Sequence, residues 1–191
     1  MNIPTFDEVM RITRDVSGIA ALEDPEAEAL YNFCLHVPTG GLVIEVGCQL
    51  GRSSSLINQL ALAIGFHDIH IDPWTDQPGW MKDWMEIMYN IGGAQEHAFS
   101  VLCMRTKQAE GILSRLGPID LAYIDGDHTK EIVDIDLDLI ADKIKPGGFL
   151  TAHDYGNPGL AGVKEALDFY TTPDRWDAIG VFGSLGVWKR Q

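Results

Sequence analysis

The sequence has few cysteines, no long apolar run and no basic leader. Its three cysteines, Cys34, Cys48 and Cys103, are an odd number without Cys-x-x-Cys spacing, so they predict neither a disulfide framework nor a structural zinc site. No apolar run reaches the roughly 18 residues that cross a membrane, and the first residues lack a basic segment followed by an apolar one. We therefore expect a cytoplasmic protein with no membrane partner.

Basic residues are also scarce. The chain has 14 Lys and Arg against 28 Asp and Glu, a formal net charge of −14. A field of this sign repels polyanions, so we expect no nucleic acid as a partner. A neutral or cationic small molecule is easier to accommodate. The length of 191 residues suits one domain, residues 1–191, with a full core, and leaves open whether the chain forms a homodimer.

The stretch from Leu42 to Leu60 predicts a strand, a glycine turn and a helix. Residues 42–46 are apolar and β-branched around one acid, as in a strand buried on both faces. Gly47 and Gly51 allow a tight turn where a ligand approaches the backbone, and the serines that follow Arg52 offer a capping hydroxyl. This order directs free amide groups and a positive helix end at an anionic group. The stretch therefore predicts a cofactor site.

The spacing of this turn is Glu45-x-Gly47-x-x-x-Gly51, which differs from the Gly-x-Gly-x-x-Gly of dinucleotide sites. An acid on the strand suits a ligand with an ammonium group. The stretch resembles motif I of class I S-adenosylmethionine-dependent methyltransferases; an ordinary strand-to-helix turn is the competing interpretation. The resemblance implies contacts to the methionine part of the cofactor from Glu45, Gly47, Cys48, Gln49, Gly51 and Ser53.

Two helices are expected before this strand, within residues 1–38. The first covers residues 5–16 and the second residues 25–36, where Glu26 and Glu28 in the first turn suit the helix dipole. Such helices usually cover a sheet edge or close a ligand site. The predicted apolar face of the first helix consists of Phe6, Val9, Ile12 and Val16.

A second strand, residues 69–71, ends at Asp72, Pro73 and Trp74. In a doubly wound sheet the tip of the second strand lies beside the sugar of the cofactor, where an acid accepts ribose hydroxyls. We therefore predict a ribose-binding role for Asp72 and a cofactor contact for Trp74. The alternative is that Asp72 only begins the turn with Pro73.

The connection over residues 75–94 is longer than a plain turn. Its large apolar residues fall on helical spacing and are Trp80, Met81, Trp84, Met85 and Met88. Such a stripe is more often core than a binding surface. Because glycines at both ends would let the segment move, we also consider it a lid that forms much of the acceptor pocket.

The remaining elements alternate in the same way. A strand over 99–104 precedes a helix over 106–116, and its end places Met104 and Arg105 beside the adenine ring. A fourth strand covers 119–124. The next helix carries an apolar stripe and ends at Pro146-Gly147-Gly148, and a fifth strand follows at 149–152. The stripe consists of Val133, Leu137, Ile140 and Ile144.

Four motifs of the second half appear in a family order: Ile124-Asp125-Gly126-Asp127-His128, Asp136-Leu137, Lys145-Pro146-Gly147-Gly148-Phe149 and His153-Asp154-Tyr155. They resemble small-molecule O-methyltransferases of the methyltransferase domain 24 type, relatives of macrocin and catechol O-methyltransferases. The resemblance runs from about Gly18 to Lys189. It implies an α/β fold: a Rossmann-like, doubly wound, seven-stranded sheet with helices on both faces and a C-terminal antiparallel hairpin over residues 176–189.

The resemblance also implies a divalent cation, magnesium or manganese, held by Asp125, His153 and Asp154. Asp125 is alternatively the partner of the cofactor's amino group. The imidazole of His153 is a departure from the family, and imidazole favours manganese, iron or zinc over magnesium. Without a metal, His128 or His153 would act as general base on the acceptor hydroxyl. His128 has a second interpretation as the N-terminal residue of an acidic helix.

These observations predict methyl transfer from S-adenosylmethionine to a hydroxyl of a small molecule. Catalysis would come mainly from positioning, since the sulfonium is already an activated donor. Two other classes stay open: a nicotinamide or nucleotide-sugar enzyme on a similar sheet, and a binding protein that keeps the fold without catalysis.

Overall fold

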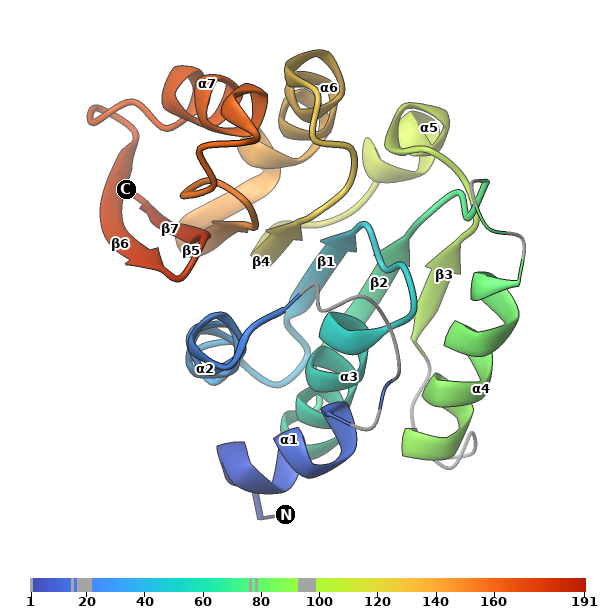
Figure 1. Cartoon of the computed structure of the whole chain (residues 1–191). Coiled ribbons are helices and arrows are strands. Elements are labelled where there is room, and N and C mark those ends of the chain that lie inside the picture. The colour runs from blue at the N-terminus through green and yellow to red at the C-terminus, as the bar shows by residue number, and fades with distance from the viewer. Residues whose placement is uncertain (1, 15, 17–21, 76, 78, 93–98) are drawn as a thin grey trace.

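The computed structural model describes residues 2–14, 16, 22–75, 77, 79–92 and 99–191. Its centre is a β-sheet of seven strands (Figure 1). In chain order these are β1 Leu42–Val46, β2 His67–Ile71, β3 Ser100–Leu102, β4 Ile119–Ile124, β5 Ile144–Ala152, β6 Trp176–Phe182 and β7 Leu185–Arg190.

The order across the sheet is β3-β2-β1-β4-β5-β7-β6. The strands from β3 to β5 are parallel, whereas β7 runs antiparallel to both β5 and β6. The predicted doubly wound sheet with a C-terminal antiparallel hairpin is confirmed. Because the chain winds outward in opposite directions from β1 and β4, the carboxyl ends of these two strands border the crevice where such sheets bind ligands.

Helices cover both faces of the sheet, as predicted (Figure 1). One face carries α1 Phe6–Thr13, α2 Asp24–Cys34, α3 Arg52–Ile64 and α4 Trp80–Gly92. The other carries α5 Glu110–Leu113, α6 Lys130–Ile140 and α7 Ala161–Tyr170, with the short 3-10 helices η1 Thr106–Ala109 before α5 and η2 Ala141–Lys143 after α6. None of the helices in the described ranges is long and apolar enough to cross a membrane.

Side chains along β1 alternate between the two faces of the sheet. Ile44 and Val46 pack into the core beneath α5, α6 and α7, whereas Val43 packs with α1, α2 and α3. Glu45 shares the face of Val43, and its carboxylate lies beneath the first turn of α3. The strand therefore places its one acid inside the molecule.

Several predicted elements needed correction. The predicted capping hydroxyl of α3 is wrong: the N-cap is Gly51 in a left-handed conformation, with no side-chain cap. Ile12 does not belong to the buried face of α1, since it is 39% exposed while Met10 is fully buried. The helix expected to run to Pro146 ends at Ile140, and Pro146 lies inside β5.

Helix α7 was not predicted, although Val163, Ala166 and Leu167 have the helical spacing that signals a buried face. Parts of the predicted segments lie outside the described residues. These are residue 15 of the first helix and residues 76, 78, 93 and 94 of the 75–94 connection.

Candidate active site

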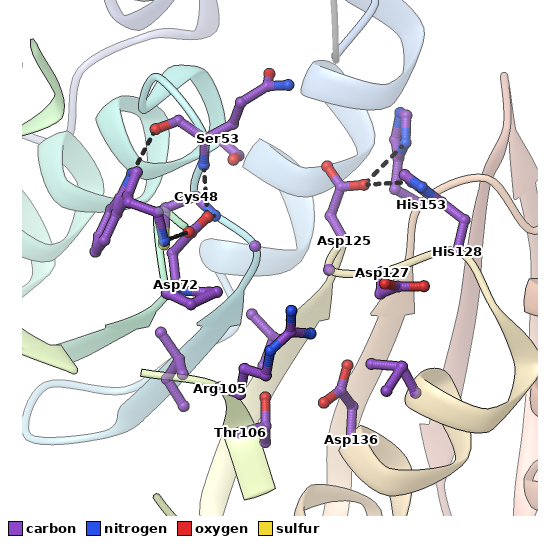
Figure 2. A pocket seen from close by; sticks show the side chains of 18 of the residues that line it. Cys48, Ser53, Asp72, Arg105, Thr106, Asp125, Asp127, His128, Asp136 and His153 are labelled. Atoms are coloured by element: carbon purple, nitrogen blue, oxygen red, sulfur yellow. Dashed lines mark hydrogen bonds and ion pairs between the residues drawn. The ribbon is translucent and has the colours of Figure 1, made fainter. Parts of the chain in front are cut away.

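A cavity of about 890 Å³ opens at the carboxyl ends of β1, β2, β4 and β5. Figure 2 shows Asp72 and Cys48 on one side of it and Asp125, His128 and His153 on the other. The predicted site residues that line it are Gly47, Cys48, Gln49, Ser53, Asp72, Trp74, Met104, Arg105, Asp125, His128, His153 and Asp154. Glu45 and Gly51 were predicted beside them but do not line the cavity.

The two glycines of the turn make room for protein atoms. Gly47 has φ of +84°, and a Cβ there would lie 1.9 Å from the carbonyl oxygen of Asp125. Gly51 has φ of +93°, and a Cβ there would lie 2.8 Å from Cδ1 of Trp84. The turn therefore needs glycine because the end of β4 and helix α4 press against it.

The carboxylate of Asp72 is bonded to the backbone of the turns around it. Its Oδ2 accepts hydrogen bonds from the backbone N of Cys48 at 2.8 Å and of Gln49 at 3.0 Å. Its Oδ1 accepts one from the backbone N of Trp74 at 2.6 Å. Asp72 thus joins the tip of β2 to the turn after β1, and two amides that we expected to be free for a ligand are taken by it.

Among the described residues, three with side chains adopt positive φ, and all three line the cavity: Gln49 at 46°, Trp74 at 44° and Asp154 at 59°. The indole Nε1 of Trp74 donates to the carbonyl oxygen of Gln49 at 2.8 Å, which ties two of them together. Such conformations cost free energy and persist where the surroundings hold them, often at functional sites.

Glu45 belongs to a sealed polar cluster behind the cavity wall. Its carboxylate accepts hydrogen bonds from the hydroxyls of Ser53 and Ser54 and lies 2.5 Å from Nδ1 of His70. The Nε2 of His70 lies 3.0 Å from Oδ2 of Asp68. Burial opposes a charged imidazole, but hydrogen bonds to Asp68 and Glu45 outweigh it and raise the pKa of His70 to about 9.

The opposite wall carries a second cluster of acids and imidazoles. Nδ1 of His153 lies 3.3 Å from Asp125 Oδ1 and 3.2 Å from Asp154 Oδ2. Nε2 of His128 lies 3.1 Å from Asp154 Oδ2 and 3.9 Å from Asp125 Oδ1. The phenol of Tyr123, two residues earlier in β4, donates a hydrogen bond to Asp125 Oδ2 at 3.0 Å. The ends of β4 and β5 thus bring Asp125, His153 and Asp154 together.

Charge in this cluster follows from its neighbours. Burial opposes ionisation of Asp125, yet the imidazoles of His128 and His153 keep its pKa below the ordinary value. The carboxylate of Asp125, and then that of Asp154, raise the pKa of His128. Burial also opposes charge on His153, but Asp125 and Glu26 outweigh it and raise its pKa to about 11. By contrast, burial and the nearby acids raise the pKa of Cys48, which disfavours the thiolate that a nucleophile needs.

Glu26 is part of this cluster, which the sequence reading missed. It lies 3.0 Å from Nε2 of His153 and is 3% exposed. Burial opposes its ionisation, but the bonds from His153 and Ser184 outweigh it and lower its pKa to about 2. The only signal in the sequence was an acid in the first turn of a helix, which has an ordinary explanation in the helix dipole.

At the cavity, the ligand atoms of Asp125, His128 and Asp154 all lie within 4.8 Å of one another, so this group could hold a cation. The sequence analysis assigned His153 to this role and His128 to that of a base. Both imidazoles contact the same two carboxylates, Asp125 and Asp154, so the sequence could not tell which histidine would complete the group.

Asp136 is a further buried acid at the cavity. It is 2% exposed, and its Oδ2 has no hydrogen-bond partner among the described residues. Burial raises its pKa to about 6, against the effect of the Thr106 hydroxyl. Figure 2 shows Asp136, Thr106 and Arg105 together along one side of the cavity. The motif Asp136-Leu137 was noted in the sequence, but no role followed from it.

Comparisons with known proteins identify the family and the fold. Residues 44–155 match a family model described as a methyltransferase domain. Among solved structures, CalS11, a TDP-rhamnose 3′-O-methyltransferase of calicheamicin biosynthesis, is similar with a TM-score of 0.69 and 16% identity, over 96% of this chain and 92% of its own. The O-methyltransferase TomG from Streptomyces achromogenes, in complex with SAM, has a TM-score of 0.68 and 15% identity over 97% and 89%.

An O-methyltransferase from Bacillus cereus in complex with SAH gives a TM-score of 0.69 and 12% identity over 98% of this chain and 93% of that one. Identities this low establish a shared fold. The family match goes further, because it begins within β1, includes the glycine turn and Asp72, and ends just after Asp154. It covers more than half of the chain and confirms the predicted class I S-adenosylmethionine-dependent methyltransferase. The chain belongs to the family of proteins that carry this methyltransferase domain.

Proposed function

We propose that this protein transfers a methyl group from S-adenosylmethionine to a hydroxyl of a small molecule. The observation that carries the proposal is one cavity with a carboxylate, Asp72, on one wall and the Asp125, His128, His153 and Asp154 cluster on the other. A volume of about 890 Å³ suits a cofactor together with a small acceptor. The named relatives CalS11 and TomG are O-methyltransferases, which favours oxygen as the acceptor atom.

In this proposal the turn from Gly47 to Ser53 binds the methionine part of the cofactor and Asp72 the ribose. Trp74, Met104 and Arg105 border the base. Glu45 acts indirectly, because its carboxylate is taken by Ser53, Ser54 and His70. An ionised Asp125 is the acid on the cavity wall that suits the amino group of the cofactor.

The proton of the acceptor hydroxyl needs a base. His128 is the candidate with the better access, since its side chain is 43% exposed and its Nε2 is held 3.1 Å from Asp154. His153 is the second candidate, but its two nitrogens are engaged by Glu26 and by the carboxylates of Asp125 and Asp154. Besides accepting the proton, either histidine would orient the acceptor hydroxyl toward the methyl group, and this positioning would be its main contribution.

The donor set of Asp125, His128 and Asp154, with His153 beside it, also suits a divalent cation. Two carboxylates and imidazole nitrogens favour manganese over magnesium, which prefers oxygen ligands. When bound, a divalent cation lowers the pKa of a coordinated hydroxyl. Asp125, His128 and Asp154 would then hold it, and the base would be needed less.

We further propose that residues 1–191 act as one domain and that the 75–94 segment encloses the acceptor. Trp80 supports this, because it lines the cavity at the start of α4. Trp84 of the same helix is fully buried and donates to the hydroxyl of Ser54 at 2.8 Å. Such packing anchors the helix, so any lid movement within α4 would concern its first turn.

The test is a calorimetric titration of S-adenosylmethionine into the protein, first with EDTA and then with manganese or magnesium. Binding in either condition supports the proposed cofactor, and a difference between conditions reports the cation. A panel of phenols, catechols and deoxysugars with labelled donor then identifies the acceptor atom. If no condition shows binding, methyl transfer is the wrong reaction and a non-catalytic binding protein becomes the better explanation.

A further inference from the structure

The carboxylate of Glu26 is enclosed by segments that lie far apart in the sequence. Its Oε1 accepts hydrogen bonds from the backbone N and the Oγ of Ser184, at 2.7 and 2.8 Å. Its Oε2 accepts one from the backbone N of Glu23 at 2.8 Å and lies 3.0 Å from Nε2 of His153. Both oxygens face donors, so the fourth contact requires a hydrogen on His153 Nε2.

The turn between β6 and β7 is built around this carboxylate. Gly183 has φ of +63°, and a Cβ there would lie 2.8 Å from both Cγ and Oε1 of Glu26. The hydroxyl of Ser184 also accepts a hydrogen bond from the backbone N of Asp154 at 3.3 Å, and its carbonyl accepts one from Gly156 at 3.0 Å. Glu26 is therefore connected to the loop after β5 through the side chain of His153 and through Ser184.

The second ring nitrogen of His153 faces the cavity cluster. Nδ1 lies 3.3 Å from Asp125 Oδ1 and 3.2 Å from Asp154 Oδ2. The two nitrogens of an imidazole point in different directions, and the partner of one fixes the ring orientation that the other presents. The carboxylate of Glu26 at Nε2 therefore fixes the ring so that Nδ1 points at Asp125 and Asp154.

We propose that Glu26 is a positioning residue for methyl transfer, which holds a hydrogen on Nε2 of His153 and keeps Nδ1 directed at Asp125 and Asp154. The inference rests on the proposed function, because that function gives His153 and Asp154 their role. It makes α2, which precedes the residues that match the family model, part of the catalytic apparatus.

The deciding variant is Glu26→Gln, which keeps the shape of the side chain. Ser184 offers two donors at the Oε1 position, whereas at the Oε2 position the backbone N of Glu23 is the one donor besides His153, so we expect the amide oxygen on the Ser184 side. The amide NH₂ then faces His153 and cannot accept a hydrogen bond from Nε2. The hydrogen on Nε2 should then be lost. Glu28→Gln is the matched control, because Glu28 lies on the same helix and is exposed.

The measurement is a ¹⁵N-histidine NMR spectrum, with the His153 signals assigned by a His153→Gln variant. We expect a protonated Nε2 in the native chain and in Glu28→Gln, and an unprotonated Nε2 in Glu26→Gln. The native spectrum tests the proposal even if Glu26→Gln does not fold: a His153 with its hydrogen on Nδ1 alone overturns it. An unchanged His153 signal in folded Glu26→Gln also overturns it.

Binding and turnover separate this inference from the proposed function. In Glu26→Gln the dissociation constant for S-adenosylmethionine should stay within about twofold, while turnover of a phenol or catechol acceptor falls about tenfold or more, as for other residues that orient a functional histidine. Turnover within about twofold of the native value contradicts a positioning role. Failure of the native chain to bind S-adenosylmethionine contradicts the proposed function, whereas the NMR result on His153 is read independently of it.

Discussion

His70 and His153 each lie between two carboxylates, and the strands that carry or precede them, β2 and β5, lie on opposite sides of β1 in the sheet. His70 lies between Glu45 and Asp68 and is fully buried, and the carboxylate of Glu45 has further partners in Ser53 and Ser54. His153 lies between Glu26 and Asp125, and its neighbour His128 has a side chain 43% exposed to the cavity. The same residue types thus form one cluster without access to solvent, around His70, and one cluster at the cavity, around His153.

The difference in solvent access gives the two histidine–carboxylate clusters different roles. Charges in a sealed cluster have no alternative partner in water, so removing one leaves the others buried and unpaired. Charges beside a cavity can exchange their partners for water, a substrate or an ion. We therefore assign the His70 cluster to stability and the His153 cluster to function, and each assignment can be tested.

The largest expected effect concerns stability. His70→Ala should lower the free energy of unfolding by about 3–5 kcal/mol, because Glu45 and Asp68 lose the imidazole between them. His128→Ala should lower it by less than about 1 kcal/mol, since its ion pairs are partly exposed. Urea unfolding of both variants measures the difference. Equal losses of unfolding free energy in the two variants would contradict the assignment of the His70 cluster to stability and the His153 cluster to function.

The pH dependence of stability provides a second test. The pKa of His70 is raised to about 9 in the fold, against about 6.5 in the unfolded chain. The folded chain keeps a proton that the unfolded chain releases, so this stabilisation is complete below pH 6.5 and is lost as pH rises through 9. The loss should be roughly 3 kcal/mol. Urea unfolding of native protein and His70→Gln across this range isolates it; parallel curves would contradict it.

At the open cluster the expected effect is on turnover. Asp154→Asn should reduce methyl transfer about 10- to 100-fold, because both His128 and His153 lose a carboxylate that orients them. Binding of S-adenosylmethionine should change little, which calorimetry checks beside the activity assay. A large loss of stability would instead mean that this cluster, too, is structural.

Asp136 shares a feature with each cluster, because it is buried and yet lines the cavity. Its Oδ2 has no hydrogen-bond partner among the described residues. If this oxygen accepts a hydrogen bond from the adenine amino group, Asp136→Ala should weaken binding of S-adenosylhomocysteine about tenfold. The inosine analogue, which lacks that amino group, should lose little. Calorimetry with both ligands tests this, and equal losses for both would exclude the contact.

The smallest effect is expected at Asp72. Asp72→Ala should weaken S-adenosylmethionine binding about three- to tenfold. The variant removes the proposed ribose contact and also the bonds that Cys48 and Gln49 donate to the carboxylate. Calorimetric titration measures the change, and an unchanged affinity would remove Asp72 from the cofactor site.

Much of the fold could be predicted because it is encoded locally. The apolar run at Leu42–Val46 and the hairpin after Trp176 have the right residues at the right spacing, and both appear as strands. The end of α6 was wrong because Ile144 continues the helical stripe, yet it pairs with Ile119 at the start of β5. Strand pairing, which involves residues far apart in the sequence, outweighed the local pattern.

The site was predictable only in part. Asp125, His153 and Asp154 were found through the family resemblance, and they lie together because parallel strands end at one edge of a sheet. Glu45 was placed in the cavity by its position in the motif, but the pleat turns it toward α3. Gly51 was predicted to face a ligand and instead accommodates Trp84. Contacts of this kind depend on neighbours that no local spacing reveals.

The sequence by itself determined the first five strands, the glycine turn, the family and the acids at the ends of β4 and β5, because periodicity and motifs act over short stretches. Only the tertiary structure decided which histidine is sealed and which is open, and it alone brought Glu26 of α2 to within 3.0 Å of His153. The physical reason is that burial and long-range contacts depend on how whole elements pack, which is a property of the assembled chain.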